Sequence, residues 1–356
     1  MNFAAAEQIA RAILYEGYVL YPYRASSIKN QHRFNFGVLY PADFCSTQTG
    51  DNKFHMQTDC LVEGDEDTKI EIRVGFLHLR QRQLARQSET LNPNSLDAND
   101  QYEPVESLEI DGQLFSTWQE AVERVVSVSP TTIGRLLERE CTHRFSFESN
   151  EETERLQDHE GRIAGIATHS QLAVEGVVQA SVEQLQLGLY RVRVQVRNAT
   201  SLDAAAIKNT DRNGALRMSL VSTHTVLAAE GGQFVSLLEP PEEFGHWATQ
   251  CQNVGTWPVL VGEFPRRDLI LSSPIILYDY PQVAPESATG LCDSTEIDEI
   301  LALRIMTLTD AEKREMRGLD SHTREILESI EDLPAEHLQK LHGAIRRLAP
   351  VVEATS

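Results

Sequence analysis

One short segment of the 356-residue chain brings together side chains that could bind a ligand, between Tyr-Pro steps at residues 21–22 and 40–41. A segment that only filled a core would not carry so many charged groups, and a solvated loop would not carry so many aromatic rings. The composition of this recognition segment, residues 18–41, therefore predicts a recognition surface or a buried polar network. Its candidate binding residues are Tyr21, Tyr23, Arg24, Ser27, Lys29, Asn30 and Arg33.

A second dense segment carries four carboxylates within one irregular stretch: Asp279, Glu286, Asp293 and Glu296. Carboxylates around a cleft can bind a hard cation or act as acid and base, although a solvated loop is the commoner explanation. Arg24 and Lys29 would be suitable ion-pair partners, above all for Asp279 and Glu286. The two dense segments would then form one pocket, from residues 21–33 and the carboxylates of 279–296.

Known catalytic fingerprints are absent from the sequence. It contains no GxSxG, GxGxxG, Walker loop, HExxH or EF-hand spacing. Ser26 and Ser27 would be nucleophiles only with a histidine beside them, and His32 is merely the nearest in sequence. The catalytic residues are unknown, and a protein without enzymatic activity is favoured over an enzyme.

The five cysteines are scattered and form no CxxC motif, so neither a disulfide framework nor a structural zinc module is predicted. Cys45, His55 and Cys60 would suit a soft metal if the fold brought them together. Buried free thiols are the favoured interpretation, because cysteine is among the most frequently buried residue types. No cofactor is expected.

The charge balance limits the class of partner. The chain has 53 acidic and 32 basic residues, a formal net charge of −21. A field of that sign repels nucleic acid and anionic membrane surfaces, so neither is expected to bind. No run of eighteen apolar residues exists, which argues against membrane insertion, and the N-terminus lacks the basic and apolar regions of a signal peptide. A cytoplasmic location is expected.

Hydrophobic patterning predicts the elements that would position these groups in the first part of the chain. Residues 4–15 favour a short amphipathic helix that Gly17 ends, and residues 54–62 and 68–80 favour strands. The Asp111-Gly112 pair is typical of a tight hairpin turn. Residues 118–126, preceded by Ser and Thr, favour a helix.

The middle of the chain has the clearest strand pattern. Tyr190, Val192, Val194 and Val196 alternate with polar residues, which predicts a strand with one buried face, and residues 163–238 should form the sheet core. Residues 148–162 are acidic and lack a core pattern, so they are expected to form a solvated connector. Start signals at Thr309, Ser321 and Pro334 then predict helices in the last part.

These elements predict an α+β protein, with an antiparallel β-sandwich or barrel-like body, a short N-terminal helix and an all-helical C-terminal tail. The expected organisation has four parts: an α+β region with the recognition segment (1–147), the acidic connector (148–162), an antiparallel β region (163–290) and a helical region (291–350).

Several blocks of sequence resemble a family of uncharacterised bacterial proteins encoded beside uptake nickel–iron hydrogenases. They are residues 14–30, 271–281, 284–301, 308–315 and 341–344. The resemblance implies a cytoplasmic accessory protein for hydrogenase maturation or assembly. The chain lacks the paired CxxC motifs with which a hydrogenase large subunit holds its metals, so it is not that subunit.

Three functional hypotheses follow. The first is an accessory or scaffolding protein whose recognition segment engages a partner protein, such as a hydrogenase subunit or maturation factor. The second is an enzyme of unknown reaction with the pocket of residues 21–33 and 279–296. The third is a soft-metal carrier that uses Cys45, His55 and Cys60.

Overall fold

Two antiparallel sheets packed face to face form the body of the protein in the computed structural model. The structure describes residues 3–19, 34–47, 50, 52–88, 102–203, 210–282, 305–319 and 321–332. The smaller sheet has five strands in the order β13 (Gln233–Val235), β1 (His55–Glu63), β11 (Leu189–Asn198), β10 (Val174–Gln186) and β7 (Cys141–Phe147). The α+β sandwich-like architecture predicted from the sequence is confirmed.

The larger sheet has eight strands and is organised around one long strand, β2 (Lys69–Gln87). On one edge of β2 the sheet continues through β12 (Val221–Glu230) to β15 (Leu269–Ser273) and β14 (Trp257–Leu260), and farther along through β9 (Ile163–Gln171) to β8 (Asn150–Gln157). On the other edge β2 pairs with β6 (Trp118–Thr132) and β3 (Tyr102–Val105). The end of β2 therefore extends the sheet beyond the five-stranded one.

The core between the sheets is the apolar face that the sequence pattern indicated. Tyr190, Val192, Val194 and Val196 are all buried. They belong to the same cluster as the apolar residues of β2, namely Ile70, Ile72, Val74 and Phe76. Removing these side chains from water on both sheets is the main favourable contribution to folding here.

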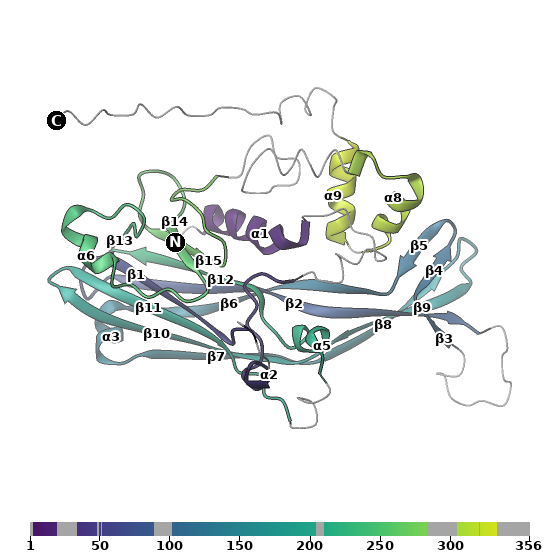
Figure 1. Ribbon diagram of the computed structural model, residues 1–356, viewed down its shortest axis with the longest axis horizontal. Coiled ribbons are helices and arrows are strands. Elements are labelled where there is room, and N and C mark those ends of the chain that lie inside the picture. Colours follow the sequence, from purple (N-terminus) through teal and green to yellow (C-terminus); the bar gives the residue numbers. More distant parts are fainter. Residues whose placement is uncertain are drawn as a thin grey trace.

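Helices cover the outer face of the larger sheet (Figure 1). Helix α1 (Ala4–Val19) packs on β12 and β15, and its N-terminal Phe3 ring lies 3.7 Å below the Arg73 guanidinium. Helices α8 (Asp310–Arg317) and α9 (Ser321–Glu331) form a hairpin beside it. Smaller helical elements lie at the ends of strands: α2 (Ala42–Thr47), α3 (Ile133–Glu138), α5 (Arg212–Leu216), η3 (Glu242–Phe244) and α6 (Gly245–Ala248).

Several local predictions are confirmed. The N-terminal helix forms, but it continues past Gly17 to Val19. The hairpin of β4 (Ser107–Ile110) and β5 (Gln113–Ser116) turns at Asp111-Gly112, where both residues have positive φ angles of 52° and 80°. Helix α8 begins with a full capping box between Thr309 and Glu312. The helix expected to begin at Pro334 lies outside the described residues.

Two predictions of secondary structure are wrong. Residues 118–126 are not helical but belong to β6, because they pair with residues 74–82 of β2, and tertiary pairing outweighs weak helix propensity. The acidic connector contains strand β8, which pairs with β9 over its whole length. Only Leu156 of β8 is buried, so this strand has no apolar alternation that the sequence could reveal.

Both sheets combine strands from the two sides of residues 148–162. Strand β1 pairs with β11, and β2 pairs with β9 and β12. The expected parts 1–147 and 163–290 thus share their sheets and their core. No helix in the described ranges is long and apolar enough to cross a membrane.

Two histidines are buried at β2: His78 belongs to this strand, and His224 of β12 packs against it. His78 donates from Nε2 to the Leu172 carbonyl (2.8 Å), and Nδ1 has no partner among the described residues. The ring of His224 lies over Gly75, where an added Cβ would approach it to 2.4 Å. Burial lowers the pKa of each imidazole from its ordinary 6.5 to about 4. Both rings are therefore neutral in the folded protein near neutral pH.

We expect Val194→Asp to lower the free energy of unfolding by about 4 kcal/mol or more, because it places an unpaired carboxylate in the core between the sheets. Denaturant titration followed by circular dichroism measures this change. The control is Ser146→Asp on the exposed face of β7, which should shift stability by less than about 1 kcal/mol. Equal stability of the two variants would contradict the assignment of the core.

The buried histidines predict a loss of stability in mild acid. Because their folded pKa lies below the unfolded value, the unfolded chain binds more protons between pH 6.5 and 4, so stability falls as the pH falls through that window. Each histidine contributes on the order of 3 kcal/mol to this loss. Unfolding free energies measured across the window should show a shallower slope for His224→Gln than for the exposed-site control His246→Gln. Identical slopes would show that His224 does not contribute.

Candidate functional site

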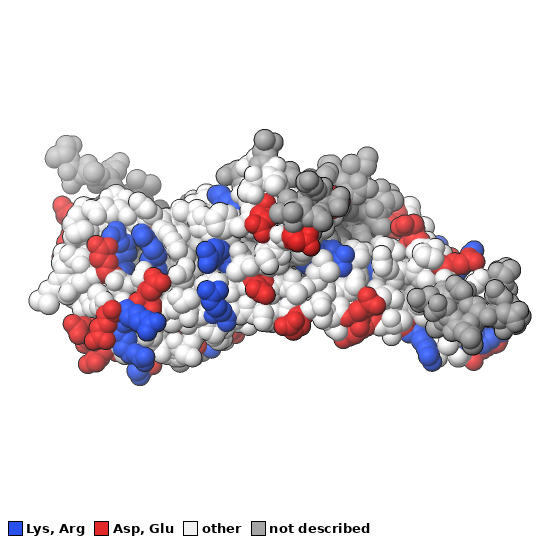
Figure 2. All heavy atoms as spheres, turned by 90° about the horizontal axis from the view of Figure 1, so that it is seen from below, with Lys and Arg blue, Asp and Glu red and all other residues white. Residues whose placement is uncertain are grey.

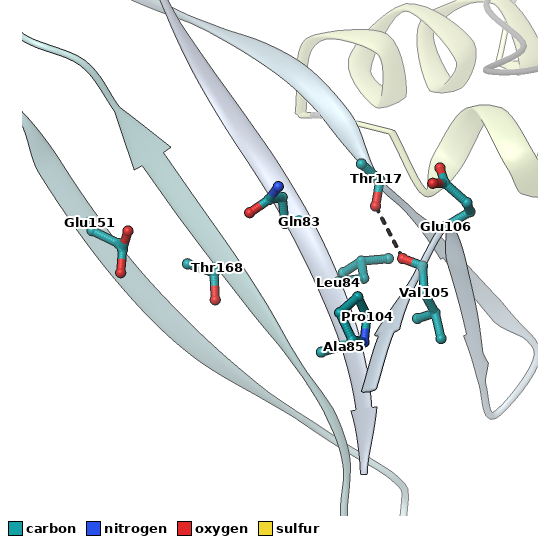
Figure 3. Close-up of a pocket in the computed structure, with 9 residues that line it drawn as sticks. All are labelled: Gln83, Leu84, Ala85, Pro104, Val105, Glu106, Thr117, Glu151 and Thr168. Atoms are coloured by element: carbon teal, nitrogen blue, oxygen red, sulfur yellow. Dashed lines mark hydrogen bonds between the residues drawn. The ribbon is translucent and has the colours of Figure 1, made fainter. Parts of the chain in front are cut away.

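An open groove of about 440 Å³ crosses the part of the larger sheet that extends beyond the five-stranded sheet (Figure 3). We call this extension the arm; it comprises the end of β2 from residue 79, together with β3, β4, β5, β8 and β9. The residues that line the groove come from β2, β3, β8 and β9, from the link between β3 and β4 and from the link between β5 and β6. They are Gln83, Leu84, Ala85, Pro104, Val105, Glu106, Thr117, Glu151 and Thr168.

Strand register places the groove side chains. Thr168 of β9 lies opposite Gln83 of β2, and Ala85 lies opposite Pro104 of β3. Register partners point to the same face of a sheet, so these residues form a continuous floor. Thr117 closes one end, since its backbone N–H donates to the Glu106 carbonyl (2.8 Å) and its hydroxyl donates to the Val105 carbonyl (3.2 Å).

The chemistry of the groove is that of a binding surface for a cation or a hydrogen-bonding chain. Glu106 and Glu151 are exposed and belong to different strand segments on the two sides of the floor (Figure 3). Neither forms an ion pair with another described residue, and the described residues of the lining include no Lys, Arg, His or Cys. Gln83 and Thr168 add an amide and a hydroxyl. Such a set can pair with ammonium or guanidinium groups, but it offers no nucleophile with an adjacent base.

A buried charge network lies on the reverse face of the same strands. Arg82 and His169 directly adjoin the groove residues Gln83 and Thr168 in sequence, and successive strand residues point to opposite faces. Glu120 of β6 is at the centre of the network. It accepts from Arg80 Nη2 at 2.6 Å and from His169 Nδ1 at 3.2 Å, and it lies 3.4 Å from Arg82 Nη1.

Arg82 also connects the arm to the helical layer. Its Nε donates to the Ser116 carbonyl (3.0 Å), and its Nη2 donates to the Gly318 carbonyl at the end of α8 (2.6 Å). The α8 backbone approaches β5 so closely that a Cβ on Gly318 would lie 1.6 Å from the Leu114 carbonyl oxygen. Glycine is therefore required at this contact.

Glu120 is held in its ionised form by the groups around it. Burial by itself would raise the pKa of the Glu120 carboxyl, but the hydrogen bond from His169 and the positive charges of Arg80 and Arg82 outweigh it, so the pKa is below its ordinary value. Glu120 is thus ionised at neutral pH. The network lies directly behind the groove floor.

Most of the site residues predicted from sequence lie outside the described residues: Tyr21, Tyr23, Arg24, Ser27, Lys29, Asn30, Arg33 and Glu286. At the end of the recognition segment, Phe34 and Tyr40 are described and are buried. The pocket expected from residues 21–33 and 279–296 stays a prediction.

Among the predicted binding residues, Asp279 lies within the described ranges. Its Oδ2 accepts from the Ser236 hydroxyl (2.5 Å), and its Oδ1 accepts from the Leu260 backbone N–H (2.7 Å). These bonds attach the segment after β15 to β14 and to the end of β13. The carboxylate therefore has a structural role at this position.

The three residues of the soft-metal hypothesis do not form a cluster. Cys60 is fully buried in the core between the sheets, whereas Cys45 packs in α2 against a different apolar cluster. Burial raises the pKa of both thiols, which disfavours the thiolate that binds metal. Within the described ranges, no three His, Cys, Asp or Glu side chains are grouped so that they could hold a metal ion.

Sequence reasoning missed the groove because its walls come from segments expected to be irregular. Glu151 lies in the expected connector and Pro104 in an expected polar excursion. Comparisons of the chain with protein-family models, curated proteins and solved structures give no match. The candidate site therefore depends on geometry alone.

We expect Glu120→Gln to destabilise the protein by roughly 3–5 kcal/mol, because Arg80 and Arg82 would lose their shared counter-charge in a buried setting. Thermal and denaturant unfolding measure the loss. Glu154→Gln removes an exposed carboxylate 3.9 Å from the same His169 and should cost less than about 1 kcal/mol. A Glu120 variant as stable as the Glu154 variant would exclude the network as a brace of the arm.

Proposed function

We propose that the protein is an accessory or scaffolding protein without enzymatic activity, and that its groove binds a basic segment of a partner protein. The observation that supports this proposal best is the pair of exposed, unpaired carboxylates on the two sides of a hydrogen-bonding floor. A Lys- or Arg-containing chain crossing the sheet would pair with Glu106 and Glu151 and would hydrogen-bond to Gln83 and Thr168.

The charge of the whole molecule favours such a partner. A net charge of −21 attracts positively charged surfaces, so it raises the association rate of a basic partner and disfavours an acidic one. The sequence resemblance suggests a hydrogenase subunit or maturation factor in the cytoplasm as the partner. In this proposal Tyr21, Tyr23 and Arg24 of the recognition segment supply further contacts.

We expect a Glu106→Lys, Glu151→Lys double variant to bind a Lys/Arg-rich peptide at least tenfold more weakly than the unmodified protein at constant ionic strength. Both carboxylates are exposed, so the fold should be retained, as circular dichroism can verify. The matched control is Glu109→Lys, Glu138→Lys, which makes the same change in net charge at exposed sites outside the groove. Equal losses in both variants would mean that binding follows net charge and not the groove.

The role of the recognition segment is tested separately, with an Arg24→Ala, Lys29→Ala variant. Capture of proteins from hydrogenase-expressing cells should fall while the melting temperature holds, because the segment is proposed to contact a partner. A collapse of the melting temperature, as expected if these cations were buried partners of carboxylates, would contradict a recognition role.

A further inference from the structure

The outward face of the five-stranded sheet divides into a covered half and an open half. On the covered half, residues 250–252 lie over outward-facing side chains of the sheet: Arg191 Nη1 donates to the Gln250 carbonyl (3.4 Å), and Gln57 Nε2 donates to the Gln252 carbonyl (2.9 Å). Val254 then pairs with the edge of β1 through backbone hydrogen bonds with Gln57. Asp59 is buried below this segment and accepts from the Gln252 backbone N–H (2.9 Å). Farther along the same face, Arg144 and Arg197 are exposed, and we call this part the open half.

Four residues form one row across the open half: Arg144 of β7, Val177 of β10, Arg197 of β11 and His55 of β1. Val177 is the register partner of both arginines, and His55 is the partner of Arg197. Their neighbours in sequence, Val178, Val196 and Met56, face the core. The row therefore faces outward. With neighbouring strands about 4.8 Å apart, the Cα atoms of the two arginines are about 10 Å apart, so both guanidinium groups can reach one ligand.

Val177 lies between the two arginines in this row. It is an apolar residue on the outward face of the sheet, yet it is only 2% exposed, and it belongs to none of the apolar core clusters. Long side chains flank it on both neighbouring strands. Its register partners are Arg144 and Arg197, and arginine stems commonly lie over apolar surface while the charged end remains in water.

The two arginines differ from their neighbours in having no counter-charge. On the same face, Arg193 forms a bidentate pair with Asp59 at 2.7 and 2.8 Å, and Arg191 pairs with Glu183. Arg144 and Arg197, in contrast, form no ion pair or hydrogen bond through their side chains with any residue in the described ranges. On the half of the molecule that contains this sheet, Figure 2 shows Lys and Arg side chains interspersed with Asp and Glu side chains.

The end of the row carries an additional unsatisfied group. Nδ1 of His55 is buried and has no hydrogen-bond partner within the described part of the chain. Buried polar atoms are nearly always hydrogen-bonded, and this orphan nitrogen belongs to the register partner of Arg197.

We propose that Arg144, Arg197 and His55 form a binding site for a single oxyanion group, a phosphate or a carboxylate. Two guanidinium forks on one face provide charge-assisted, bidentate donors for such a group, and Val177 forms the apolar floor between them. A polyanion such as nucleic acid does not fit, because the strongly acidic remainder of the molecule repels an extended array of phosphates. The site is separate from the groove on the arm and does not depend on its function.

The test is isothermal titration of the full chain with inorganic phosphate and, in a second series, with acetate, both at constant ionic strength so that general screening does not change. We expect saturable binding of at least one of the two anions. An Arg144→Gln, Arg197→Gln double variant should bind at least tenfold more weakly. Arg139→Gln, an exposed arginine just beyond α3, is the control for loss of a surface cation and should retain full affinity.

The comparison of ligands identifies the group: tighter binding of phosphate indicates a phosphorylated ligand, and comparable binding of acetate indicates a carboxylate ligand. Circular dichroism verifies that the variants remain folded, as expected for exposed arginines without partners. Absence of saturable binding of both anions, or equal affinity in the double variant and the unmodified protein, would overturn the proposal. The groove variants should bind the anion normally, so this result and that of the peptide experiment are independent.

Discussion

The backbone pairing of β2 is the constraint on which the rest of the structure depends. This strand of 19 residues is paired on both edges along most of its length: with β12 and then β9 on one side, and with β6 and then β3 on the other. Its first half supplies the apolar face that meets the five-stranded sheet, and its second half extends past that sheet as the arm. A single strand thus belongs to both the sandwich core and the groove, and it fixes the position of one relative to the other.

The change in function of β2 along its length follows from what lies on each face. Near Ile72 and Phe76 the inner face is dry, and burial of aliphatic surface stabilises it. Near Arg80 and Arg82 there is no opposing sheet to supply apolar partners, and charged side chains occupy the same face. Their burial would be costly if they were alone, and Glu120, His169 and the Gly318 carbonyl offset that cost by charge and hydrogen bonding. The arm therefore combines these polar contacts with a small apolar cluster of its own, which includes Leu84, Ile110, Leu156 and Ala167.

The arginines of β11 illustrate how a uniform sequence pattern acquires different roles. Arg191, Arg193 and Arg197 alternate with valines and look equivalent in sequence. The segment before β14 covers the part of the sheet near Arg193, where Asp59 neutralises it, and ends before Arg197. One arginine becomes a structural ion-pair member and another remains available, because their tertiary neighbours differ.

The sequence by itself determined the features that depend on local patterns: the inward face of β11, the Asp111-Gly112 hairpin, the N-terminal helix, the capping box at Thr309 and the antiparallel α+β class. Each arises from residues close in the chain, so side-chain periodicity and turn chemistry suffice to predict it. Tertiary structure decided the rest. Residues 118–126 became a strand because β2 offered hydrogen-bond partners, and β8 formed without an apolar face because the edge of β9 was open. The groove, the Glu120 network and the Arg144–Arg197 row each join residues from three or more strands, and only the register between those strands brings the charges together.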